Sequence, residues 1–142
     1  MEPAFKRILL KLSGEVLAGE EKTGIDFQMV ETVCKRIKTC RDMGAEIGIV
    51  IGGGNFWRGR SSGKMDRTRA DSMGMLATVI NCLALNDTLE QMGVPSVVMT
   101  AVDMVKIAEP FTARGARAHL ESGKVVIFGA GTGSPFFSTD TG

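Results

Sequence analysis

The stretch with the most varied chemistry in this chain is residues 129–142. It combines glycines, hydroxyl side chains, two aromatic rings and a carboxylate directly after the apolar run 125–128. Hydroxyl groups both donate and accept hydrogen bonds, and an aromatic ring can pack on a base. The mixture indicates a site for a flat, polar, anionic ligand such as a nucleotide; the plainer alternative is a polar turn with two core aromatics. The side chains concerned are Thr132, Ser134, Phe136, Phe137, Ser138 and Thr139.

Two further candidates follow apolar runs. Lys11 ends the run 5–12, where its ammonium could neutralise charge on a transferring phosphoryl group, or could simply reach water. Gly52, Gly53 and Gly54 end the run 45–51 and could form a backbone nest for phosphate oxygens ahead of a helix N-terminus, or merely a tight turn. Neither GxGxxG nor GxxxxGK[ST] is present, which excludes the Rossmann and P-loop fingerprints.

Two charged residues lie downstream of the glycines. Arg58 could hold a phosphate through two hydrogen bonds, or could stack on Trp57 at the surface. Asp71 lies near the start of a long apolar-faced segment, where its carboxylate could accept hydrogen bonds from ribose hydroxyls. Its alternative role is a favourable interaction with the helix dipole, which requires no ligand.

These candidates need a scaffold of alternating strands and helices. The apolar runs predict strands over 5–12, 45–51, 94–99 and 124–128, with a loop or hairpin over 15–25. Helical spacing predicts a helix capped by Asp26 and ended by Gly44, a long helix ended by Gly93, and a short helix over 112–121. Continuous apolar strands separated by helices indicate a parallel sheet covered on both faces. Ligands bind beyond the carboxyl ends of such strands, where three of the candidate motifs fall.

Composition limits the classes of function. The 142 residues suffice for one domain with a sizeable core, and a net charge of +1 gives no electrostatic case for nucleic acid or an anionic membrane. Cys34, Cys40 and Cys82 form no CxxC pair and are expected to be reduced packing residues. His119 is the only histidine and has no ligand cluster around it, so no metal site is predicted. The N-terminus lacks a signal-peptide pattern, which favours a cytoplasmic protein.

Four motifs, taken together, resemble the bacterial uridylate (UMP) kinases of the amino-acid-kinase superfamily. They span the whole chain in that family's order: Lys-Leu-Ser-Gly-Glu at 11–15, Ile-Gly-Gly-Gly-Asn-Phe-Trp-Arg-Gly at 51–59, Asp-Ser-Met-Gly-Met-Leu-Ala-Thr at 71–78, and the segment 131–141. The resemblance implies a three-layer αβα sandwich with a mainly parallel sheet.

The resemblance also implies an activity: transfer of the γ-phosphoryl of ATP, with Mg²⁺, to UMP, giving UDP for pyrimidine nucleotide synthesis. It further implies a cytoplasmic hexamer with GTP or UTP as effectors and with its main contacts on the first long helix, residues 26–43. Lys11 and Arg58 resemble catalytic residues. The residues implied at ATP are Lys11, Leu12, Ser13, Gly14, Gly54 and Arg58, and those implied at UMP are Gly53, Asp71, Thr132, Gly133, Ser134, Pro135, Phe136, Phe137, Ser138 and Thr139.

This chain departs from the family in two respects. Ser134 stands where many members have Asn, and it lacks the paired donor and acceptor of an amide. The family continues past this motif into a half that holds the adenine and ribose of ATP. Residues 1–142 are therefore expected to form a single, truncated domain carrying the UMP side, with activity of its own in question. Two alternatives stay open: a kinase of this fold acting on a carbamate, glutamate or aspartate, and a non-catalytic nucleotide-binding fragment.

Overall fold

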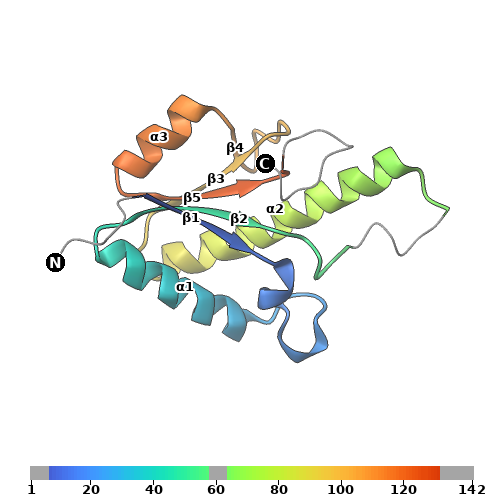
Figure 1. The fold of residues 1–142 in the computed structure, drawn as a ribbon, viewed down its shortest axis with the longest axis horizontal. Helices are drawn as coiled ribbons and strands as arrows, with labels where there is room; N and C mark the ends of the chain where they lie inside the picture. Colours follow the sequence, from blue (N-terminus) through green and yellow to red (C-terminus); the bar gives the residue numbers. More distant parts are fainter. Residues whose placement is uncertain (1–6, 58–63, 132–142) are drawn as a thin grey trace.

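The computed structural model describes residues 7–57 and 64–131 of the chain as a parallel sheet between helices (Figure 1). The sheet order is β1-β2-β5-β3-β4, and every neighbouring pair is parallel. The predicted three-layer α/β fold is therefore confirmed. Its strands are β1 (Arg7–Leu12), β2 (Glu46–Ile51), β3 (Ser96–Thr100), β4 (Glu109–Pro110) and β5 (Val125–Gly129), and its helices are α1 (Phe27–Asp42), α2 (Arg67–Gln91) and α3 (Ala113–Glu121).

The two faces of the sheet are covered unequally. Helices α1 and α2 pack on one face, where β2 contributes Ile47, Ile49 and Ile51 to the main core (Figure 1). On the other face the nine-residue α3 packs over β5 and β3. A hollow of about 290 Å³ remains over β1 and β2 on that face, and Leu9 beside it is 59% exposed. The main hydrophobic stabilisation therefore comes from the side of α1 and α2.

Helix ends follow the predicted chemistry. The Asp26 carboxylate accepts a hydrogen bond from the Gln28 N–H at 2.9 Å and caps α1. Gly44, with φ of +98°, follows α1, and Gly93, with φ of +81°, follows α2. A residue with a side chain would be strained in either conformation, so both glycines stop their helices where the spacing predicted.

The structure adds one strand to the prediction and decides between the two alternatives, loop or hairpin, for residues 15–25. Strand β4 was not foreseen, because two residues carry no periodicity; its Pro110 is tolerated since β4 is the outermost strand and pairs only with β3. The segment 15–25 forms no hairpin. It folds instead as the 3₁₀ turns η1 (Gly14–Leu17) and η2 (Gly19–Glu21), and the Ser13 hydroxyl accepts the Glu15 N–H at 3.3 Å to start the first.

The cysteines behave as packing residues. Cys34 and Cys82 are fully buried and Cys40 is half-buried, and all three are free thiols. Burial raises the pKa of Cys34 and of Cys82 to about 12. Within the described residues, no helix is long and apolar enough to cross a membrane.

Alkylation should therefore distinguish the thiols. At pH 8 iodoacetamide is expected to modify Cys40 and to spare Cys34 and Cys82, because only an accessible thiolate reacts. Peptide mass spectrometry measures this, and urea should make all three react. Modification of Cys82 as fast as Cys40 without denaturant would contradict the buried assignment.

The buried thiols also make the free energy of unfolding depend on pH. Because folding raises the pKa of Cys34 and Cys82, their stabilising contribution is complete below the unfolded pKa of about 9 and falls as the pH rises toward 12.

Candidate functional site

The ends of β1 and β2 meet at the carboxyl edge of the sheet, as predicted. The Gly52 N–H donates a hydrogen bond to the Leu12 carbonyl at 2.9 Å. Gly14, buried in the first turn after β1, packs directly against the Gly52 carbonyl. The Lys-Leu-Ser-Gly motif and the triple glycine therefore form one continuous piece of surface.

The glycines here are required by close approach. A Cβ on Gly14 would lie 2.5 Å from the Gly52 carbonyl oxygen, and one on Gly53 would lie 2.6 Å from the Ala77 Cβ on α2. Neither Gly52, Gly53 nor Gly54 has a positive φ. A turn over 54–56 follows the triple glycine and α2 begins at Arg67, so the role of the glycines as a phosphate nest stays a prediction.

Two buried amide side chains, overlooked in the sequence, hold this edge together. The Asn81 Nδ2 donates to the Gly52 carbonyl at 2.8 Å and to the Asn55 Oδ1 at 2.7 Å. The Asn55 Nδ2 donates in turn to the Gly24 carbonyl at 2.8 Å and to the Asn81 Oδ1 at 3.0 Å. Asn55 is 2% exposed and Asn81 is fully buried. The available signal was Asn81 itself, a polar residue between apolar neighbours on a helix.

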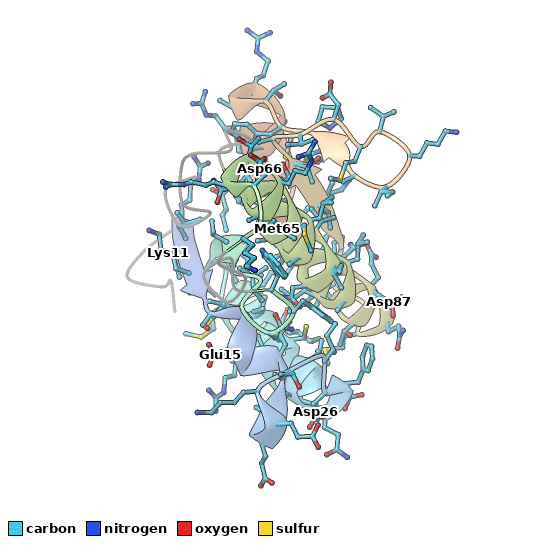
Figure 2. The ribbon with its side chains drawn as sticks, turned by 90° about the vertical axis from the view of Figure 1, so that its right-hand side faces the viewer. Lys11, Glu15, Asp26, Met65, Asp66 and Asp87 are labelled. Carbon is cyan, nitrogen blue, oxygen red and sulfur yellow. The ribbon has the colours of Figure 1, made fainter. Side chains whose placement is uncertain are left out.

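Lys11 is exposed at the end of β1 and is labelled in Figure 2. It pairs in register with Val50 of β2, on the face of the sheet that α3 covers. On that face a hollow of about 50 Å³ opens beside Val50 at the carboxyl ends of β3 and β5. The hollow can hold water-sized groups, and it is too small to enclose a nucleotide. Its lining is Val50, Met99, Ala101, Phe111, Phe128, Gly129 and Gly131.

Asp71 lies in the second turn of α2 with about a third of its side chain exposed. The N-cap of α2 is Asp66, whose carboxylate accepts the Arg69 N–H at 3.1 Å (Figure 2). Asp71 is therefore not needed as the N-cap of α2. Its Oδ2 lies 3.9 Å from the Nε of Arg67, one turn earlier on the helix. The Trp57 Nε1 donates to the Ala70 carbonyl at 2.9 Å and ties the glycine turn to this part of the helix.

Thr78 joins α2 to the end of β5. Its Oγ1 accepts the Ala130 N–H at 2.8 Å and donates to the Met75 carbonyl at 2.6 Å, and the residue is 1% exposed. Ala130 has φ of +67° and Gly131 has φ of +55°. A side chain in this left-handed region is uncommon, so the buried hydrogen bond helps to hold a turn that the backbone alone disfavours.

Part of the predicted site lies outside the described residues: Arg58 and the whole segment from Thr132 to Thr139. The structure brings Lys11, Ser13, Gly14 and Gly53 to one edge of the sheet, with Asp71 on the helix behind Trp57. Across residues 7–57 and 64–131, no group of three His, Cys, Asp or Glu side chains could hold a metal ion.

These features define an α/β protein of the parallel-sheet class whose candidate site loops gather at the carboxyl edge of the sheet. The chain belongs to the amino acid kinase family, whose sequence profile matches residues 6–142.

Solved structures agree with this family. UMP kinase from Ureaplasma parvum has a TM-score of 0.89 and 38% identity, and the match covers 95% of this chain and 60% of that one. UMP kinase from Bacillus anthracis has a TM-score of 0.91 and 39% identity, covering 97% of this chain and 58% of that one. Aspartate kinase from Synechocystis, at 16% identity and a TM-score of 0.61, shares the fold alone. The chain thus spans about 60% of the length of the two UMP kinases.

Substitution of the glycines should show whether close backbone approach or conformational flexibility is the reason that glycine stands at these positions. Gly14→Ala and Gly53→Ala are each expected to lower stability by about 1–3 kcal/mol, because the new methyl meets atoms that cannot move away. Gly52→Ala is the matched control, since its Cβ would lie 3.5 Å from the nearest atom. Urea unfolding measures the three differences. Equal losses at all three positions would show that flexibility, not space, selects glycine here.

Thr78→Val should test the link between α2 and the turn after β5. It keeps the shape of the side chain and leaves the buried Ala130 N–H without its acceptor, at an expected cost of about 1–3 kcal/mol. Thr78→Ser keeps the hydroxyl and should cost less. Hydrogen exchange at the Ala130 amide should accelerate in the valine variant and not in the serine variant; the reverse order would refute the link.

Proposed function

We propose that this chain carries the acceptor side of a UMP kinase, which transfers the γ-phosphoryl of ATP to UMP to give UDP and ADP. The observation that carries the proposal is the convergence of the Lys11–Gly14 motif, the triple glycine and the start of the loop after β5 at one edge of the sheet. Two UMP kinases that match nearly the whole chain at 38–39% identity support it. A cytoplasmic location, hexameric assembly and GTP or UTP as effectors belong to the same proposal.

The chemistry would rest on positioning and electrostatics. The Lys11 ammonium would stabilise negative charge as the phosphoryl group passes between nucleotides. Backbone groups of Ser13, Gly14 and Gly54, with Arg58, would contact the ATP phosphates, and ATP would arrive as its Mg²⁺ complex. Gly53 and Asp71 would hold UMP. The residues proposed to complete the UMP site are Thr132, Gly133, Ser134, Pro135, Phe136, Phe137, Ser138 and Thr139.

The alternatives differ in the acceptor. The aspartate kinase similarity supports only a shared fold, so it gives no reason to prefer an amino acid substrate. A non-catalytic nucleotide-binding role is the other candidate, since the same sheet edge could hold a nucleotide without transferring its phosphoryl group. Binding and turnover therefore need separate measurements.

Binding can be followed by Trp57, the only tryptophan of the chain, which bonds to the residue before Asp71. UMP is expected to change its fluorescence, with aspartate and carbamoyl phosphate giving no change. Asp71→Asn should weaken UMP binding about tenfold or more, because a charge-assisted hydrogen bond is lost. Asp42→Asn, at the exposed end of α1, is the control. A response to aspartate and none to UMP would refute the proposal.

Turnover is measured with ATP, Mg²⁺ and UMP. Lys11→Ala should lower any phosphoryl transfer about 100-fold or more while leaving UMP binding within a few-fold, since the lysine acts on charge that develops during transfer. UMP binding without turnover in the parent chain would favour the non-catalytic alternative.

A further inference from the structure

The peptide between Gly52 and Gly53 is held by a side chain from another element. The Asn81 Nδ2 donates to the Gly52 carbonyl at 2.8 Å from the middle of α2, 29 positions along the chain. Its second proton goes to the Asn55 Oδ1 at 2.7 Å, and the Asn81 Oδ1 accepts the Asn55 Nδ2 at 3.0 Å. An amide side chain supplies two donors and an acceptor from one short group, and an apolar residue in the same place would supply none.

The bond from Asn81 sets the direction of the next backbone donor. No cis peptide occurs among the residues that the structure describes. In a trans peptide the carbonyl oxygen and the following N–H point in opposite directions. Because the Gly52 carbonyl is drawn toward Asn81, the Gly53 N–H points away from Asn81. Rotation of this peptide would leave one donor of the fully buried Asn81 amide without a partner, which is costly.

The Gly53 N–H has no acceptor within the protein. Gly53 is buried, and across residues 7–57 and 64–131 its N–H donates to nothing, as is also true of the N–H groups of Gly54 and Asn55. The Gly53 carbonyl, by contrast, accepts the Phe56 and Trp57 N–H groups, both at 3.0 Å. Buried backbone donors are nearly always paired in folded proteins. An unpaired donor at the carboxyl edge of the sheet therefore indicates a place for an acceptor atom of a ligand.

We propose that Asn81 is a positioning residue: by holding the Gly52 carbonyl, it keeps the Gly53 N–H directed at a phosphate oxygen of the bound nucleotide. Backbone N–H groups suit anionic oxygens, and such bonds weaken steeply when the donor is turned away. Asn81 is fully buried and acts only through the peptide that it holds. The inference rests on the proposed function, because it takes the phosphate of UMP as the acceptor of this hydrogen bond.

A comparison of UMP with uridine, which lacks the phosphate, tests this role by NMR titration. Asn81→Leu keeps the branched shape of the side chain and removes its hydrogen bonds. The variant should bind UMP about tenfold more weakly and uridine within about twofold of the parent chain, because only the bond to the phosphate is lost. Equal weakening of UMP and uridine binding by Asn81→Leu would overturn the proposal.

The matched control is Leu85→Ala. Leu85 is fully buried one turn further along α2, and its side chain makes no hydrogen bond to the glycine turn. The alanine variant leaves a cavity in the core and keeps the bond from Asn81 to Gly52. A general loosening of α2 would therefore change UMP binding in both variants. Loss of UMP selectivity over uridine in Leu85→Ala as large as in Asn81→Leu would count against a specific role for Asn81.

The amide signal of Gly53 tests the inference in the unmodified chain, so the test does not depend on the folding of a variant. A hydrogen bond to an anion shifts an amide proton downfield and slows its exchange with water. UMP and inorganic phosphate should each have this effect on the Gly53 amide, and uridine should not. In Asn81→Leu, inorganic phosphate should leave the Gly53 signal unchanged.

The outcomes separate this inference from the proposed function. If the chain binds UMP and the Gly53 amide does not respond, the proposed function stands and the role of Asn81 is overturned. If the chain does not bind UMP, but inorganic phosphate moves the Gly53 amide in the parent and not in Asn81→Leu, the proposed function fails and the role of Asn81 in directing this donor stands. A Gly53 amide that responds to neither ligand overturns the inference.

Discussion

The buried pair Asn55–Asn81 is the interaction on which the rest of the candidate site depends. Two amide groups in a dry environment are costly unless each finds partners, and here they satisfy one another and the carbonyls of Gly24 and Gly52. These bonds join three segments that are far apart in the sequence: the loop before α1, the turn after β2 and the middle of α2. The position of the glycine turn is therefore fixed by α2 and not by the turn itself.

The close packing at Gly14 and Gly53 follows from this arrangement. The backbone of the first turn lies very near the Asn55–Asn81 pair, since a Cβ on Gly14 would lie 2.5 Å from the Asn55 Oδ1. Gly53 in turn lets the strand end lie against Ala77 of the same helix. Thr78, the next residue, holds the Ala130 N–H. One stretch of α2, residues 77–81, thus positions the ends of both β2 and β5, which are neighbours in the sheet.

This dependence explains what the sequence could and could not predict. Apolar runs and caps are local signals, so four of the five strands, the three helices and the stops at Gly44 and Gly93 could be predicted from short windows. The co-location of Lys11 and the glycines followed from the general geometry of parallel sheets. The Asn55–Asn81 pair could not be predicted, because a hydrogen bond between residues 26 positions apart leaves no periodic trace. The reason for each glycine stayed open in the sequence: close approach and positive φ favour the same residue, and only the structure distinguishes them.

The composition of α2 reflects these separate demands on one helix. Its inner side must fill the core with Leu85 and Leu89, and its edge must present Asn81 and Thr78 to two loops. Its outer side carries Met73, Leu76, Ile80 and Leu83, which neither task requires. Leu76 is 50% exposed and Ile80 is 46% exposed, so about half of each residue's area stays in contact with solvent and does not contribute to folding. Their presence beside a polar cluster that fixes the sheet edge suits a helix that is held rigidly from within and is apolar from without. The residues that position the candidate site thus lie on the side of α2 that faces the sheet, and they restrict the helix through hydrogen bonds to the ends of β2 and β5.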